Sequence, residues 1–114
     1  MWFRVAKISE FENSKMICRE IAGVRIVLGK NGTKLFAFNS SCPHKGGPLQ
    51  EGELKGLTIK CPWHGYEFNV ISGKPTRIPY SSKYGNWRKT GNLTLYEVKV
   101  LSVNILVNIP KNNS

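Results

Sequence analysis

The chain has 114 residues, of which 40% are hydrophobic, and its 17 Lys and Arg against 7 Asp and Glu give a formal net charge of +10. This length suits one domain with one core, and the composition excludes a disordered chain. No apolar run approaches the roughly 20 residues of a membrane-spanning helix, and residues 1–7 lack the apolar stretch of a signal peptide. We therefore expect a single domain over residues 1–114, located in the cytoplasm and without a membrane partner.

The positive charge is compatible with three kinds of partner, which are nucleic acid, an anionic surface and an acidic protein. The basic residues are scattered along the chain, and none of their runs is longer than Arg88-Lys89. No motif of the common nucleic-acid-binding modules is present. We expect no nucleic-acid partner and favour an acidic protein.

The N-terminal part consists of short strand-like segments separated by turns, with no sustained helical periodicity. A first strand is expected over Trp2–Ile8, and Ser9–Glu12 is expected to form one helical turn capped by Ser9. Three further strands, separated by Ala22-Gly23 and Gly29–Gly32, should form a meander. They are Met16–Ile21, Val24–Leu28 and Leu35–Phe38.

The middle of the chain differs in composition from both ends. Two segments, Cys42–Leu49 and Cys61–Asn69, are rich in Gly and Pro and contain both histidines of the chain. Such residues do not easily build a hydrophobic core, so we expect something other than packing to hold these segments together. A metal centre would do so.

Two strands are expected near the C-terminus, because apolar and polar residues alternate over Tyr96–Val100 and Val103–Ile109. Leu93 and Leu95 follow the opposite phase, which predicts a bulge or a strand start near Leu95. Residues 81–92 are polar and contain glycine, so they are expected to form a loop. The whole pattern predicts an all-β fold.

The candidate metal ligands form two similar motifs. Cys42 and His44 form a C-x-H motif, and after sixteen intervening residues Cys61 and His64 form a C-x-x-H motif. Thiolates and imidazoles suit both zinc and iron–sulfur clusters. A single zinc ion, bound tetrahedrally by all four residues, is therefore an alternative to a cluster. A weaker alternative is that the four are ordinary core or surface residues that bind no metal. We favour the cluster because zinc modules commonly pair like ligands at close spacing, whereas Cys and His alternate in this chain.

These two loops, together with Phe68-Asn69 and Ser72–Pro75, resemble the signature of the Rieske family. The resemblance implies a [2Fe–2S] cluster with an inner iron bound by two cysteines and an outer iron, nearer the surface, bound by two histidines. Carried over to this chain, the ligands are Cys42 and Cys61 for the inner iron, and His44 and His64 for the outer iron. Pro75 and Pro79 match the position of the family's third, proline-containing loop.

The fold implied by the resemblance is the Rieske iron–sulfur fold, which is all-β. We expect an antiparallel β-sandwich base built from both chain ends. A small cluster-binding subdomain is expected at about residues 40–70.

Departures from the family pattern bear on the reduction potential. High-potential members carry an extra cysteine in each loop, which form a disulfide, and hydroxyl groups that donate to the cluster sulfurs. The extra-cysteine positions are Gly47 and Trp63 in this chain, and the hydroxyl positions are Tyr66 and Phe68. Because donors to the sulfurs favour the reduced state, their loss predicts a low reduction potential.

The resemblance implies a one-electron carrier between a reductase and an oxygenase or another acceptor, closest to the small soluble archaeal Rieske-type ferredoxins. Catalysis is not expected, because an oxygenase needs two further histidines for a mononuclear iron and a reductase needs a G-x-G-x-x-G motif, which the chain lacks. The expected partners are redox proteins, acidic ones in view of the charge, and the chain is expected to be a monomer. The alternatives are a small Rieske subunit of a multicomponent oxidoreductase and a redox sensor.

Overall fold

The computed structural model describes residues 1–44, 46–63, 65–78 and 90–110. These residues form short strands and two 3-10 helices, which confirms the all-β prediction. The strands are β1 (Trp2–Lys7), β2 (Met16–Ile21), β3 (Val24–Asn31), β4 (Lys34–Asn39), β5 (Glu53–Lys55), β6 (Thr58–Lys60), β7 (Glu67–Asn69), β8 (Pro75–Arg77), β9 (Leu95–Leu101) and β10 (Asn104–Asn108). The helices are η1 (Ile8–Phe11) and η2 (Leu49–Glu51). No helix in this described part is long and apolar enough to cross a membrane.

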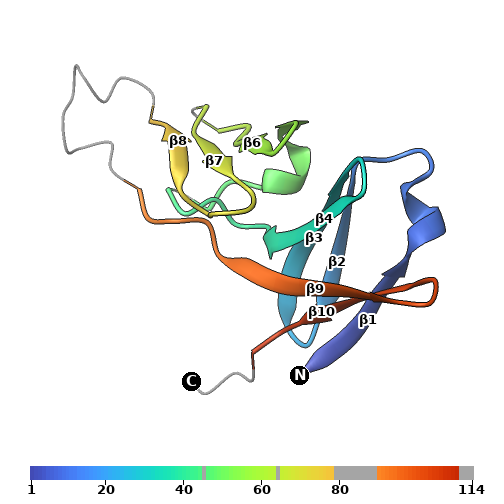
Figure 1. The fold of residues 1–114 in the computed structure, drawn as a ribbon. Helices are drawn as coiled ribbons and strands as arrows, with labels where there is room; N and C mark the ends of the chain where they lie inside the picture. The colour runs from blue at the N-terminus through green and yellow to red at the C-terminus, as the bar shows by residue number, and fades with distance from the viewer. Residues whose placement is uncertain (45, 64, 79–89, 111–114) are drawn as a thin grey trace.

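Six strands form one antiparallel sheet in the order β1-β10-β9-β4-β3-β2 (Figure 1). The first strand pairs with the last, and the meander of β2, β3 and β4 has the predicted order. Only two residue pairs, Ala37 with Tyr96 and Phe38 with Leu95, join β4 to β9. At this short junction the sheet folds back, so that β1, β10 and β9 share a core with β2, β3 and β4. This arrangement is the predicted sandwich base, built from both chain ends.

Strand β3 lies between two hydrophobic cores, since its residues Ile26, Val27 and Leu28 are all fully buried. Ile26 and Leu28 belong to the sandwich core, with Ile105 and Val107 of β10. Val27 alternates to the opposite side, where it joins the core beneath the second sheet. One strand therefore fixes the second sheet to the sandwich.

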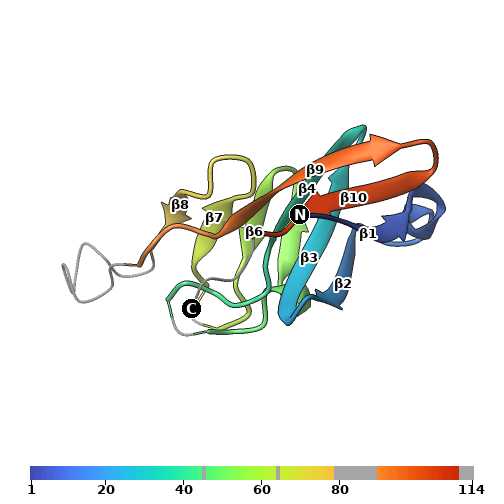
Figure 2. The ribbon, with the colours of Figure 1, turned by 90° about the horizontal axis from the view of Figure 1, so that it is seen from below.

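The second sheet has the order β5-β6-β7-β8 and lies beside the sandwich (Figures 1 and 2). Its residues Leu54, Ile59 and Phe68 share a buried core with Phe38 of β4. The second sheet thus packs in a core that it shares with the sandwich and does not build one of its own. Its core residues are separated by turns, so they form no apolar run in the sequence. The sheet continues to Arg77, past the subdomain limit expected near residue 70.

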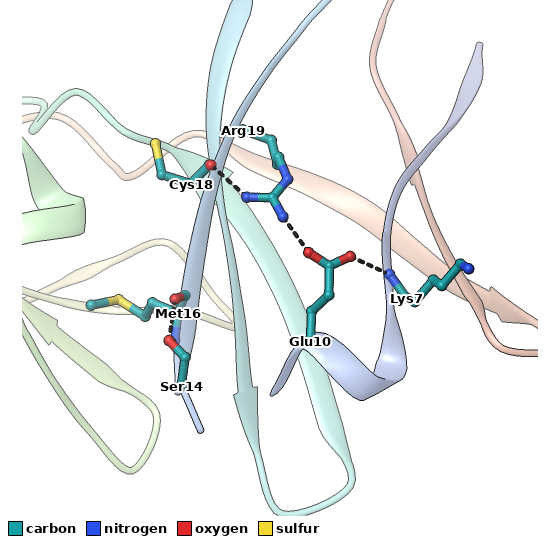
Figure 3. Close-up of polar contacts among 6 residues, drawn as sticks. All are labelled: Lys7, Glu10, Ser14, Met16, Cys18 and Arg19. Atoms are coloured by element: carbon teal, nitrogen blue, oxygen red, sulfur yellow. Dashed lines mark hydrogen bonds and ion pairs between the residues drawn. The ribbon is translucent and has the colours of Figure 1, made fainter. Parts of the chain in front are cut away.

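Helix η1 connects β1 to the loop before β2 and is anchored by Glu10 (Figure 3). The Glu10 carboxylate accepts a hydrogen bond of 2.8 Å from the Lys7 backbone N–H and forms an ion pair with Arg19 of β2. The backbone hydrogen bond is the main cause of a lowered pKa at Glu10, and Arg19 adds to it. The prediction that Ser9 caps this turn is wrong, because the helix begins at Ile8 and Ser9 lies inside it.

The predicted C-terminal strands are present, with small shifts at their ends. Strand β9 begins at Leu95, which confirms the strand start predicted there. Register shifts are found elsewhere, in β1 between Arg4 and Ala6 and in β7 between Glu67 and Phe68. Of the loop predicted at residues 81–92, residues 81–89 lie outside the described part of the chain, as does Pro79.

The substitution Phe38→Ala is expected to destabilise the protein by about 3–5 kcal/mol, because it removes a fully buried ring from the core that both sheets share. Thermal unfolding followed by circular dichroism measures the loss. Ile71→Ala is the control, since that side chain is 41% exposed. Equal melting temperatures for the two variants would contradict the packing role of Phe38.

Candidate metal centre

The first loop places Cys42 at the start of a tight turn between β4 and η2. The Cys42 backbone N–H donates to the Gly47 carbonyl at 2.9 Å, and the Gly46 N–H donates to the Cys42 carbonyl at 2.8 Å. Gly46 has a φ of +78°, which glycine adopts without the strain that a side chain would bring. An isolated β-bridge between Ser41 and Pro48 closes the base of the loop.

The second loop, between β6 and β7, repeats this arrangement. The Cys61 backbone N–H donates to the Tyr66 carbonyl at 2.7 Å, so each cysteine bonds to the carbonyl five residues further on. Gly65 has a φ of +73° and follows Cys61 by four residues, as Gly46 follows its cysteine in the first loop. The two loops of similar sequence therefore fold into similar turns.

These turns bring the thiols of Cys42 and Cys61 together. Both side chains are buried, and the Cys42 thiol is a hydrogen-bonding neighbour of Cys61. Burial raises the pKa of the Cys61 thiol to about 11, with the Trp63 backbone N–H acting against this rise and Cys42 adding to it. Two adjacent buried thiols become thiolates when metal cations replace their protons, so this pair is suited to metal ligation.

His44 lies in the first loop, and its imidazole stacks on Tyr66 of the second loop. The two ring centroids are 4.0 Å apart, and the ring planes make an angle of 19°. Tyr66 is fully buried, so it gives the His44 ring a rigid neighbour. The sequence motif identifies Tyr66 only as a hydroxyl position. It gives no sign of this contact, which joins two loops that are distant in the chain.

Gly47 and Trp63 form a close contact between the two loops. A Cβ atom added at Gly47 would lie 3.0 Å from Cys61 Sγ and 3.0 Å from Trp63 Cδ2, so glycine allows this approach. The Trp63 side chain is 48% exposed. At these two positions the family resemblance places the disulfide cysteines of high-potential members, and in this chain a glycine and an indole occupy them.

His64, the fourth predicted ligand, lies outside the described residues. Among the residues that the structure does describe, no three His, Cys, Asp or Glu side chains form a group that would hold one metal ion. The structure thus brings Cys42 and Cys61 together and orients His44 on Tyr66. The ligand role of all four residues stays a prediction.

The family follows from a comparison with known proteins, because the sequence matches the Rieske [2Fe–2S] domain over residues 1–103. The chain belongs to the Rieske [2Fe–2S] family. Its cofactor is therefore a [2Fe–2S] cluster. The side chains present fit this group, since Cys42 and Cys61 stand side by side for one iron and His44 offers a nitrogen ligand for the other.

Relatives of this Rieske chain differ in length. Apoptosis-inducing factor 3 of Homo sapiens is 35% identical over 75 residues, which are 66% of this chain and 12% of that protein. Ferredoxin CarAc of Metapseudomonas resinovorans is 28% identical over 86 residues, which are 75% of this chain and 80% of that protein. This chain thus spans a small part of the first relative and most of the second.

A solved structure agrees with the whole fold. The ferredoxin of carbazole 1,9a-dioxygenase from Nocardioides aromaticivorans IC177 is 25% identical and superposes with a TM-score of 0.80. The superposition covers 94% of this chain and 96% of that one. The similarity confirms the Rieske iron–sulfur fold.

Proposed function

We propose that this chain is a Rieske-type ferredoxin, which carries single electrons and performs no catalysis itself. The observation that carries the proposal is the pair of matching loops, which place the thiols of Cys42 and Cys61 next to each other. The fold around them is similar to that of a dioxygenase ferredoxin. A bound [2Fe–2S] cluster takes up one electron and gives it back. The chain's own residues supply the ligands, keep water from the thiolates and orient an imidazole.

Each iron is assigned two ligands, Cys42 and Cys61 for the inner iron, and His44 and His64 for the outer iron. The two cysteines belong to the hydrophobic core beneath the second sheet, in which Leu49 is fully buried. Such apolar packing excludes water and lowers the local dielectric constant around the thiolates. His44 is partly exposed, so a partner protein can approach the side from which an electron leaves.

The partners that we propose are a reductase, as donor, and an oxygenase or another acceptor. The half-exposed Trp63 adds apolar surface next to the metal centre, and apolar surface of this kind contributes to docking. The net charge of +10 favours acidic partners, which it would attract over a distance. We place the protein in the cytoplasm as a monomer.

A small subunit of a larger oxidoreductase is the second candidate. One observation favours it, because the match to apoptosis-inducing factor 3 covers only 12% of that protein. The domain therefore also occurs within longer chains. A stable complex with a catalytic subunit, isolated from the native source, would support this candidate over the freely diffusing carrier.

Anaerobic purification followed by visible and electron paramagnetic resonance spectroscopy tests the proposed function. We expect a coloured protein with about two irons for each chain and the spectrum of a Rieske cluster, in which nitrogen ligates one iron. One-electron reduction must be reversible for a carrier. A colourless protein that holds a single zinc ion would refute the proposal.

The reduction potential is expected near the low end of the Rieske range, roughly −150 mV. Phe68 has no hydroxyl group to donate to a cluster sulfur, and the contact between Gly47 and Trp63 takes the place of a disulfide. Without the hydroxyl donor and the disulfide, the reduced state of the cluster is less stable, which lowers the reduction potential. Redox titration followed by visible absorption measures the midpoint, and a value well above zero would contradict this reasoning.

A further inference from the structure

Four exposed aliphatic side chains gather at one end of the sandwich. Leu101 is 65% exposed and Val103 57%, both at the turn between β9 and β10, and Val100, 46% exposed, precedes Leu101 on the other face of β9, where it pairs with Ile105. Ile8, the first residue of η1, is also exposed, and its backbone N–H donates to the Val103 carbonyl at 3.0 Å. We call these four residues the hairpin tip.

The backbone of the hairpin tip is well anchored. Strands β9 and β10 are paired up to the turn, where Leu101, the last residue of β9, pairs with Asn104, the first residue of β10. The turn between them is tight, with Ser102 at a φ of +60°. Glu10 fixes η1 to both β1 and β2 (Figure 3). The aliphatic groups are therefore presented on a preformed surface, so little ordering of the chain is needed when another surface covers them.

Three basic side chains lie on one face of the sheet behind the hairpin tip. Directly paired residues of an antiparallel sheet point to the same face. Arg4 and Lys99 pair with the same residue of β10, so they share this face. Lys7 and Leu101 likewise pair with one residue of β10 and form the next row, nearest the tip. All three basic side chains are exposed.

Glu97 is the carboxylate that the pairing places on this face, and Glu10 lies in η1, which follows β1. Glu10 is bound by Arg19 and by a backbone N–H, as described above. Glu97 accepts a hydrogen bond of 3.0 Å from the Asn108 side chain. Trp2 and Glu97 both pair with Asn108 of β10, so they lie in one row across the sheet and on the same face. The Lys99 ammonium is 4.2 Å from the centre of the Trp2 ring. The face thus combines net positive charge with an aromatic ring beside an apolar turn.

We propose that the hairpin tip inserts into a membrane surface rich in anionic phospholipids, where Arg4, Lys7 and Lys99 contact the headgroups. Aliphatic groups on a projecting turn, with cations and an indole behind them, match the boundary between acyl chains and phosphates. The net charge of +10 adds to the attraction. The sequence predicts no membrane partner because no segment is long enough to span a bilayer, and surface insertion requires no such segment.

The location of the hairpin tip is compatible with electron transfer. Figures 1 and 2 place the turn between β9 and β10 at the opposite end of the molecule from β7 and β8 of the second sheet. A chain held by the hairpin tip would leave the metal centre accessible to redox proteins. The inference goes beyond the proposed function and does not depend on it, since the sandwich presents this surface whether or not the cluster carries electrons.

Co-sedimentation of the cluster-loaded protein with lipid vesicles tests the proposal. We expect binding to vesicles of phosphatidylcholine with a quarter phosphatidylserine, no binding to phosphatidylcholine alone, and release at high salt. The double substitution Leu101→Ser with Val103→Ser should weaken binding about tenfold or more. Lys99→Gln should weaken it about fivefold, which is the usual contribution of one lysine near an anionic surface.

Matched controls lie in the turn between β7 and β8 of the second sheet, where Ile71 and Lys74 are also exposed. Ile71→Ser and Lys74→Gln should bind as the wild type does, and an unchanged visible spectrum shows that each variant is folded. Absence of binding to the anionic vesicles, or equal losses in the controls, would overturn the proposal. So would a dimer that only the tip substitutions disrupt, without vesicle binding, because it would assign the hairpin tip to a second copy of the chain.

Discussion

Replacing His64 by alanine is expected to abolish the visible absorption and the electron paramagnetic resonance signal of the [2Fe–2S] cluster. The outer iron would lose one of its two protein ligands, and a methyl group provides no replacement. Cys61→Ser is expected to have the same effect on the inner iron, because a serine oxygen is a poor substitute for a thiolate in binding iron–sulfur clusters. The measurement is the visible spectrum together with the iron content of the purified protein.

The matched control for these ligand variants is Cys18→Ser. Cys18 lies on β2 in the sandwich, partly buried, and burial raises the pKa of its thiol. We expect this variant to keep the full spectrum and iron content. An unchanged spectrum in His64→Ala would refute the ligand assignment. Loss of the spectrum in Cys18→Ser as well would show that the signal follows general unfolding instead of ligation.

The parts of the fold that are predictable from the sequence are those with local determinants. Strand β2 covers Met16–Ile21 as predicted, because its apolar residues and the following Ala22-Gly23 turn are contiguous in the sequence. The cysteine loops are predictable for the same reason. A Cys-Pro start and a glycine four residues after the cysteine fix the course of each turn within a few residues.

The features that the sequence does not predict depend on contacts between distant segments. Strands β5, β6 and β7 have three residues each with one buried in each, which is too short for a periodic signal. The stacking of His44 on Tyr66 joins two loops, and the hairpin tip joins Ile8 to Val103. The cap predicted at Ser9 is wrong because the helix begins one residue earlier, at Ile8, and Glu10 holds its start through the Lys7 backbone N–H and the ion pair with Arg19.

Replacing Gly52 by alanine is expected to destabilise the protein by about 3 kcal/mol and to loosen the second cysteine loop. Its added Cβ would lie 2.0 Å from the Lys60 backbone carbonyl oxygen, closer than any non-bonded contact allows. Because the obstacle is backbone, relief requires β5 and β6 to move apart, and this is overpacking that no rotamer change relieves. Lys60 directly precedes Cys61, so the displacement reaches a predicted ligand. Thermal unfolding followed by visible absorption and by circular dichroism measures both effects.

Gly91→Ala is the control that separates backbone crowding from the loss of a glycine in general. A Cβ atom added at Gly91 meets no atom within 4 Å, and the φ angle of Gly91 does not lie in the positive range that favours glycine. Its melting temperature should stay within the small range typical of surface substitutions. If Gly52→Ala melts as the control does, the second sheet adapts to an extra methyl group and the close packing of β5 on β6 does not hold the cysteine loop. If absorption is lost at a lower temperature than the circular dichroism signal, the crowding acts on the cluster-binding loop before it acts on the sandwich.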